Sequence, residues 1–147
     1  MLAPGEPAPD FVATAHDGRR IALKDLRGRR VLLYFYPKAD TPGCTAESCG
    51  FRDRLSDYES LDTVILGASF DTPEENTAFA KKFGLPFPLL CDTDKSLAIK
   101  YGAATDGSAP VPKRVSCLID ETGKVLRYYP QVAAREHPAE VLRDLTE

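Results

Sequence analysis

Two β-prone segments, the first of them an uninterrupted apolar run, place the strongest limits on what this chain can fold into. They occupy residues 31–36 (Val-Leu-Leu-Tyr-Phe-Tyr), which end at Pro37, and residues 64–70 (Val-Ile-Leu-Gly-Ala-Ser-Phe). Continuous apolar runs of this length are typical of central strands that are buried on both faces. Each run is followed by a helical pattern, at residues 42 to about 60 and at residues 73–84. Because strand and helix alternate twice, the sequence predicts an α/β fold.

The remaining segments predict a mixed sheet with helices on both faces and an N-terminal β-hairpin. The expected elements are a hairpin around Asp17-Gly18, a strand at 88–91, a helix at 95–101, strands at 115–119 and 125–129, and a helix at 137–145. The 147 residues, 43% of them hydrophobic, suffice for one domain spanning 1–147. The loop at 103–113 is the longest irregular piece and a candidate border of a functional site.

Charge and hydropathy argue against nucleic-acid and membrane partners. Nineteen basic and 22 acidic residues give a net charge of −3, and the densest basic spot, residues 27–30, fits a solvated turn. The longest apolar run, residues 31–36, is far shorter than the roughly 18 residues that cross a bilayer. The first ten residues lack the basic and apolar regions of a signal peptide. We therefore expect a cytoplasmic protein, whose cysteines are more often catalytic, metal-binding or buried than joined in structural disulfides.

Two of the four cysteines lie where the first predicted strand gives way to the first helix. Cys44 ends the segment Thr41-Pro-Gly-Cys, in which Thr41 is the expected helix N-cap. A thiol at a helix start meets unpaired backbone N–H groups and the positive end of the helix dipole, which favour the thiolate. The dipole contributes at most about 2 kcal/mol, whereas a thiolate that predominates at neutral pH needs roughly 3 kcal/mol. Cys44 is therefore the candidate nucleophile and needs a nearby cation, and Cys49 is a candidate redox partner.

The segment at residues 34–53 resembles the active-site signature of the peroxiredoxins, and within them the bacterioferritin-comigratory or PrxQ subfamily. Shorter matches lie at residues 9–11, 87–90, 114–120 and 137–142. The resemblance implies a thioredoxin-like fold and thiol-dependent reduction of hydrogen peroxide and organic hydroperoxides, without metal or flavin. The family motif Pro-x-x-x-Thr-x-x-Cys and its distant arginine fall on Pro37, Thr41, Cys44 and Arg114.

The resemblance also implies roles for the residues around the peroxidatic Cys44. Arg114 is the expected cation, and the sequence spacing alone does not single it out among the arginines. The Thr41 hydroxyl is expected to bond the incoming peroxide oxygen, with an ordinary helix cap as the alternative, and Pro37 to shield the thiolate from water. Glu47 lies three residues after Cys44 on the same helix face, where its charge opposes a thiolate. We therefore hypothesise that Glu47 pairs with an arginine and fixes the guanidinium.

Cys49 is the expected resolving residue for the sulfenic acid formed on Cys44. The two condense to an intramolecular disulfide, which a thioredoxin-type dithiol reduces. Residues five apart on an intact helix have Cα atoms roughly 8.7 Å apart. A disulfide needs less than about 7 Å, so the first turns of the helix must unwind in each cycle. Cys91 and Cys117 lie in short apolar strands and are expected to be buried and inert, with Cys91 kept as a reserve resolving residue.

Two other functions fit parts of the pattern. Thiol–disulfide oxidoreductases usually carry Cys-x-x-Cys, whereas four residues separate Cys44 from Cys49. The second alternative is a non-enzymatic zinc module or redox sensor that uses all four cysteines. Zinc needs close cysteine pairs of the Cys-x-x-Cys type, which the sequence does not contain, whereas a sensor role is compatible with peroxidase activity. His16, beside a turn, and His137, at a helix start, are expected to cap or to be exposed rather than to catalyse. We expect no metal and no cofactor, and the subfamily resemblance favours a monomer.

Overall fold

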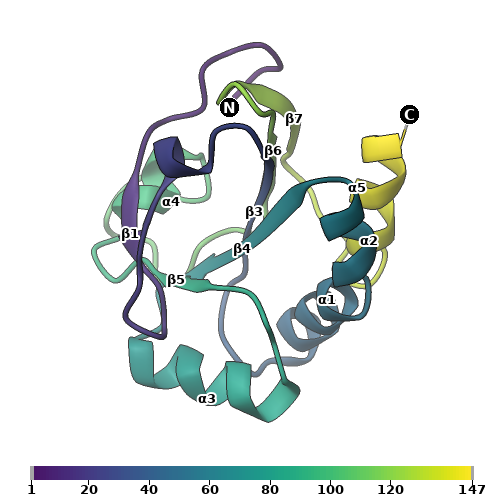
Figure 1. The fold of residues 1–147 in the computed structure, drawn as a ribbon. Helices are drawn as coiled ribbons and strands as arrows, with labels where there is room; N and C mark the ends of the chain where they lie inside the picture. The colour runs from purple at the N-terminus through teal and green to yellow at the C-terminus, as the bar shows by residue number, and fades with distance from the viewer. Residues whose placement is uncertain (1, 147) are drawn as a thin grey trace.

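The computed structural model describes residues 2–146 as a five-stranded sheet with helices on both faces and a separate two-stranded hairpin (Figure 1). The sheet order is β5-β4-β3-β6-β7, in which β3, β4 and β5 run parallel and β6 and β7 are antiparallel to their neighbours. The strands are β1 (Val12–Thr14), β2 (Arg20–Ala22), β3 (Arg30–Phe35), β4 (Thr63–Ser69), β5 (Leu89–Cys91), β6 (Ser116–Ile119) and β7 (Val125–Tyr129). The helices are the 3₁₀ helix η1 (Leu23–Leu26), α1 (Pro42–Asp53), α2 (Leu55–Ser60), α3 (Pro73–Phe83), α4 (Ser96–Lys100) and α5 (His137–Thr146). The predicted mixed sheet, flanking helices and N-terminal hairpin are confirmed.

Strand β3 forms the centre of the sheet and is buried on both faces, as the sequence predicts. Val31, Leu33 and Phe35 belong to the core cluster on the face of α4 and the hairpin. Leu32 and Tyr34 belong to the cluster on the opposite face, which α1, α2, α3 and α5 cover. The alternation follows from the strand period of two, which sends successive side chains to opposite faces. None of the helices in residues 2–146 is long and apolar enough to cross a membrane.

Helix α3 shows how local sequence sets the ends of an element. The Thr72 hydroxyl accepts a hydrogen bond from Glu75 N (3.2 Å), and the Glu75 carboxylate accepts one from Thr72 N (3.0 Å). This reciprocal capping box satisfies two donors at the helix start. The helix ends at Gly84, whose left-handed φ of 61° is favourable for glycine. The predicted bounds of this helix are confirmed.

The single helix predicted for residues 42 to about 60 is wrong, because Arg54 separates α1 from α2. Arg54 leaves the helical conformation (φ −109°, ψ 10°), and its N–H donates to Phe51 O at 3.2 Å. Tyr58 in α2 is buried with its ring centroid 5.7 Å from that of Phe51, and its hydroxyl donates to Pro138 O at 2.5 Å. The bend at Arg54 thus accompanies the packing of α2 against α5, and the local sequence does not predict it.

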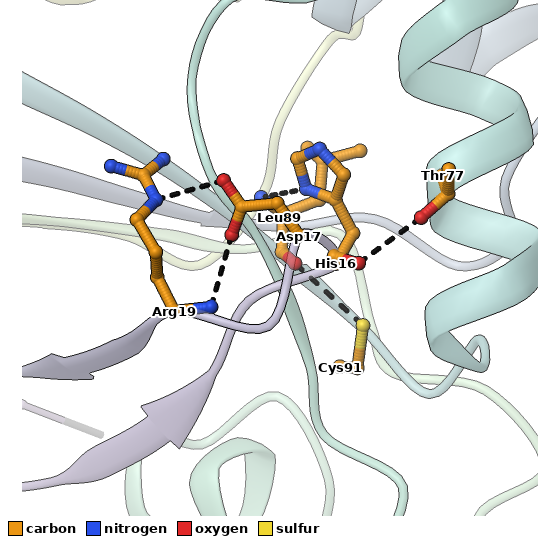
Figure 2. Close-up of polar contacts among 6 residues, drawn as sticks. All are labelled: His16, Asp17, Arg19, Thr77, Leu89 and Cys91. Atoms are coloured by element: carbon orange, nitrogen blue, oxygen red, sulfur yellow. Dashed lines mark hydrogen bonds and ion pairs between the residues drawn. The ribbon is translucent and has the colours of Figure 1, made fainter.

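The N-terminal hairpin is attached to the edge of the sheet through His16 (Figure 2). Ala15 forms a bridge with Leu90, His16 N donates to Leu89 O (2.8 Å), and Leu89 N donates to His16 Nδ1 (3.1 Å). Thr77 Oγ1 of α3 donates to His16 O at 3.1 Å. His16 was expected to cap or to be exposed beside a turn. It is instead a half-buried link between the hairpin, β5 and α3.

Gly67 in β4 lies where the core leaves no room for a side chain. A Cβ there would lie 2.9 Å from Leu89 Cδ2 and 3.0 Å from Tyr34 Cζ. We therefore expect Gly67→Ala to lower the free energy of unfolding by about 1–3 kcal/mol, measured by urea denaturation. Gly107→Ala is the control, because a Cβ there meets no described atom within 4 Å. Equal losses in the two variants would contradict the packing argument.

Candidate active site

Cys44 is the third residue of α1 and is fully buried in this conformation. Thr41 occupies the N-cap position with extended backbone (φ −100°, ψ 156°), and Pro42 is the first helical residue. Thr45 N donates to Thr41 O at 2.8 Å and makes the first bond of the helix ladder. Pro42 carries no N–H, and the N–H groups of Gly43 and Cys44 precede that first bond, so they lack partners within the helix. The thiol therefore lies at the positive end of the helix dipole.

Thr41 has the predicted N-cap position, but its side chain does not cap the helix. Its hydroxyl donates to Lys38 O at 2.8 Å, within the loop that joins β3 to α1. With its proton donated there, the oxygen keeps its lone pairs for another donor. Pro37 is half-buried in the same loop, two residues after the end of β3. The loop thus brings both predicted residues to the entrance of α1.

Arg114 connects Cys44 to Glu47 across the site. Its Nη2 donates to Cys44 Sγ at 3.4 Å, and its Nη1 donates to Glu47 Oε1 at 2.8 Å. Arg114 lies two residues before Ser116, which pairs with Tyr34 at the end of the β3–β6 ladder, so the sheet brings Arg114 beside α1. A Cβ at Gly43 would lie 3.0 Å from Arg114 Nη2, so glycine leaves the guanidinium its space. The geometry contains the Glu47–arginine pair that the sequence led us to hypothesise.

Burial sets the protonation behaviour of this pair. The Glu47 side chain is 0% exposed, and its Oε2 finds no hydrogen-bond partner among residues 2–146. Burial raises the pKa of Glu47 to about 7, although the charge and hydrogen bond of Arg114 lower it. Burial alone lowers the pKa of Arg114, but its contacts with Cys44 and Glu47 outweigh burial and raise it. The guanidinium therefore stays charged, while Glu47 exchanges its proton near neutral pH.

The raised pKa of Glu47 predicts a pH-dependent stability. The ordinary pKa of a glutamate is 4.5, and that of Glu47 in the folded protein is about 7. Between these two pH values, the folded protein keeps a proton that the unfolded chain has lost. Unfolding then releases a proton, so the free energy of unfolding falls as the pH rises through this window. Relative to Glu47→Gln, which cannot titrate, the reduced wild type should lose about 3 kcal/mol between pH 4.5 and 8. Urea unfolding of both proteins measures this difference, and a constant difference across the window would contradict it.

The other cysteines differ in exposure, and all four are free thiols. Cys117 is buried, as predicted, and burial raises the pKa of its thiol to about 12. The prediction that Cys91 is buried is wrong, because it ends β5 at the sheet edge and is half-exposed. Its Sγ accepts from Asn76 Nδ2 (3.4 Å) and donates to Leu89 O (3.7 Å; Figure 2). Cys49 is half-buried on α1.

His137 is buried, so the expectation that it caps a helix or is exposed is wrong. Its Nε2 lies 2.8 Å from Ser116 Oγ, and its Nδ1 lies 2.8 Å from Glu140 Oε1. The ring makes edge contacts with Phe51 and Tyr129, with centroids 6.0 and 4.8 Å away. Burial lowers the pKa of His137. The residue joins α5 to β6 and α1, a tertiary role that its place at a helix start does not signal.

Within residues 2–146, the structure contains no group of three or more His, Cys, Asp or Glu side chains placed to hold a metal ion. The expectation of chemistry without a metal or cofactor stays a prediction.

Comparison with known proteins places the chain in a family. The AhpC/TSA family model matches residues 4–128. A putative peroxiredoxin Bcp from Coxiella burnetii is 41% identical over 143 residues, which cover 94% of this chain and 95% of the relative. A cysteine-to-serine mutant of Xylella fastidiosa PrxQ superposes with a TM-score of 0.92 at 27% identity, covering 99% of this chain and 96% of that one. The bacterioferritin comigratory protein of Xanthomonas campestris gives a TM-score of 0.90 at 26% identity, covering 98% of each chain.

These similarities extend over the thiol site as well as the sheet, because the matched residues include α1 and Arg114. The chain belongs to the AhpC/TSA family and, within it, to the Bcp/PrxQ peroxiredoxins, which are thiol-dependent peroxidases.

Proposed function

We propose that Cys44 is the peroxidatic residue and that it reduces hydrogen peroxide and organic hydroperoxides. The thiolate attacks the terminal peroxide oxygen, the O–O bond breaks, and Cys44 becomes a sulfenic acid. The leaving oxygen takes up a proton and departs as water or an alcohol. The observation that carries this proposal is the contact between Arg114 Nη2 and Cys44 Sγ (3.4 Å) at the start of α1. The alkyl peroxide reduction activity named for the Xanthomonas campestris relative supports the inclusion of organic substrates.

Thr41 and Pro37 shape the approach of the peroxide in this proposal. The Thr41 hydroxyl gives its proton to Lys38 O, so its lone pairs accept the O–H of the incoming hydroperoxide. That bond aligns the O–O axis with the sulfur for in-line attack. Half-buried Pro37 excludes water from the same side. Backbone N–H groups at the start of α1 and Arg114 stabilise the charge that develops on the leaving oxygen.

Glu47 positions Arg114 rather than contacting substrate. Its carboxyl accepts from Nη1 at 2.8 Å and so holds the guanidinium plane with Nη2 directed at Cys44. Because the pKa of Glu47 is raised to about 7, a large share of the molecules carry it uncharged at neutral pH. An uncharged Glu47 keeps the hydrogen bond and leaves the positive charge of Arg114 to the thiolate. Burial thereby reduces the repulsion between Glu47 and Cys44 that the sequence alone suggests.

Cys49 resolves the sulfenic acid in this proposal. Its thiol attacks the Cys44 sulfur, water leaves, and an intramolecular disulfide forms, which a thioredoxin-type dithiol reduces. Both cysteines lie within the unbroken helix α1, so their Cα atoms are roughly 8.7 Å apart, beyond the limit of about 7 Å for a disulfide. The first turns of α1 must therefore open before the bond forms.

This opening predicts a difference in amide hydrogen exchange between redox states. We expect the amides of residues 45–50 to exchange at least tenfold faster in the oxidised protein, because each broken ladder bond exposes an amide to water. Exchange measured by mass spectrometry on reduced and oxidised samples checks this, with α3 (Pro73–Phe83) as the internal reference. Equal protection of residues 45–50 in both states would rule out the opening step.

Peptide mapping after one equivalent of hydrogen peroxide tests the proposed function. A Cys44–Cys49 bridge together with consumed peroxide is the expected result. A Cys44–Cys91 bridge would transfer the resolving role to Cys91, which is half-exposed and thus open to such a reaction. Reduction of insulin disulfides without peroxide consumption would instead favour a thiol–disulfide oxidoreductase. We further propose a cytoplasmic monomer, which sedimentation and fractionation of the native cells test.

A further inference from the structure

The peptide unit between Lys38 and Ala39 has both of its polar groups held by the protein. Its carbonyl oxygen accepts from Thr41 Oγ1 at 2.8 Å, and its N–H donates to Asp71 Oδ2 at 2.8 Å. The peptide bonds of residues 2–146 are trans. Because a trans peptide is planar, with its N–H and C=O pointing in opposite directions, the group that fixes the N–H also fixes the carbonyl. The orientation of the Thr41 hydroxyl is therefore linked to Asp71.

Asp71 is held independently of the loop that it contacts. Its side chain is buried, and Ser69 Oγ donates to the same Oδ2 at 2.8 Å. Asp71 N in turn donates to Ser69 Oγ at 3.2 Å. Asn76 Nδ2 donates to Ser69 Oγ (3.3 Å) and to Asp71 O (3.4 Å). The carboxylate is thus anchored to the end of β4 and to α3, two elements outside the peroxide site.

The contact continues the pairing of β3 with β4 beyond the edge of the sheet. The last ladder bond runs from Tyr36 N to Ala68 O at 3.0 Å. Beyond it, Ala39 N donates to the Asp71 side chain instead of to a backbone carbonyl of β4. Asn76 also accepts from the Tyr36 hydroxyl at 2.6 Å, which fixes the residue that leads into the loop. The loop is therefore held at both Tyr36 and Ala39 by one buried hydrogen-bond network.

We propose that Asp71 is a positioning residue of the peroxidase site, which sets the direction of the Thr41 hydroxyl through the Lys38–Ala39 peptide. The inference rests on the proposed role of Thr41 in binding the peroxide. A carboxylate that accepts from the N–H also polarises the peptide and makes Lys38 O a stronger acceptor for Thr41. Asp71 thus holds the carbonyl that takes the Thr41 proton, which leaves the Thr41 lone pairs for the peroxide, and it does not touch the substrate itself.

Stopped-flow measurement of the second-order rate constant for hydrogen peroxide tests this role. We expect Asp71→Ala to lower the constant about tenfold, the value of roughly one neutral hydrogen bond. Asp71→Asn keeps an acceptor oxygen for Ala39 N and should recover most of the rate. Alkylation of Cys44 by iodoacetamide needs the thiolate but not Thr41, so it should not be slowed in either variant. If Asp71 only stabilised the fold, its removal would slow peroxide reduction and alkylation to the same extent.

A double-mutant cycle with Thr41→Val identifies the path of the effect. In the Thr41→Val background, Asp71→Ala should cause less than a twofold further loss, because the hydroxyl that it orients is already gone. Asp92→Asn is the matched control. Its buried carboxylate accepts from Leu97 N (3.0 Å) and Ala98 N (2.8 Å) near the same sheet edge, and its peroxide rate should stay unchanged.

Three results would overturn the inference: an unchanged rate in Asp71→Ala, equal losses in peroxide reduction and alkylation, or a full tenfold loss in the Thr41→Val background. If Asp71→Ala does not fold, the ratio of the peroxide rate to the alkylation rate is measured in Asp71→Asn and Asp71→Ser instead. An unchanged ratio in both variants would overturn the inference. A wild-type protein that consumes no peroxide would refute the proposed function and this inference together. An active wild type whose peroxide rate is unchanged by substitution of Asp71 would refute this inference alone.

Discussion

Cys44→Ser is expected to lose peroxide consumption entirely, by more than about a thousandfold in the second-order rate constant. A serine hydroxyl does not ionise near neutral pH and forms no sulfenic acid, so the first bond-forming step disappears. The contact between Arg114 Nη2 and the side chain at position 44 persists, because serine is nearly isosteric with cysteine. Peroxide loss measured with excess dithiothreitol checks this, and circular dichroism checks that the variant folds.

Two further cysteine variants serve as controls for Cys44→Ser. Cys91→Ser should keep its peroxide rate, since Cys91 ends β5 and a serine hydroxyl keeps an acceptor for Asn76 Nδ2. Cys49→Ser should still consume one equivalent of peroxide and then accumulate a sulfenic acid that a dimedone-type reagent traps. Residual turnover in Cys44→Ser that a second substitution at Cys91 removes would transfer the peroxidatic role to Cys91.

Arg114→Met is expected to slow the reaction with hydrogen peroxide by about 10²–10³-fold, the usual cost of removing one preorganised charged donor. The substitution removes the cation that lies 3.4 Å from Cys44 Sγ, and with it the stabilisation of both the thiolate and the leaving oxygen. It also leaves Glu47 buried without its partner at 2.8 Å. Arg114→Met should therefore be combined with Glu47→Gln, so that the loss reports on Cys44 rather than on an unpaired carboxylate.

Arg114→Lys separates charge from geometry in the same measurement. A single ammonium nitrogen cannot hold Glu47 and Cys44 in the two-pronged arrangement of a guanidinium, so its rate should lie between those of wild type and Arg114→Met. Arg127→Met is the control, because the Arg127 side chain is 58% exposed and pairs with Asp144 rather than with Cys44 or Glu47. A loss of less than about threefold in Arg114→Met would contradict the proposed role of the guanidinium.

Local signals in the sequence predict most of this fold. The apolar run at residues 31–36 and the Thr72-Pro73 start of α3 depend on neighbours within one strand or one helical turn, and both predictions are confirmed. The break at Arg54 and the burial of His137 depend on contacts between distant segments. Tyr58 bonds to Pro138, 80 positions away, and His137 contacts Ser116 across 21. No periodicity within α1 or α5 carries that information.

The residues of the site also divide into those that local sequence predicts and those that depend on contacts between distant segments. The positions of Thr41 and Cys44 follow from the Thr-Pro-Gly-Cys segment, which sets the register of α1. Arg114 lies 70 positions from Cys44, and the family resemblance rather than the spacing identified it. Asp71 is not predicted from the sequence, because an aspartate before the Thr72 N-cap is typical of an ordinary turn. The sequence signal at this position is a carboxylate directly after the second buried strand, at the same sheet edge as the loop after the first.

The antiparallel pairing of β3 with β6 also determines when during folding Arg114 reaches Cys44. Cys44 and Arg114 meet only after a long stretch of chain has been synthesised and the Tyr34–Ser116 register has formed. Contacts between residues so distant in sequence form late, because loop closure must precede them. A nascent or misfolded chain therefore carries Cys44 as an ordinary thiol. The contact between Arg114 and Cys44, on which the proposed mechanism depends, is confined to molecules that have completed the sheet.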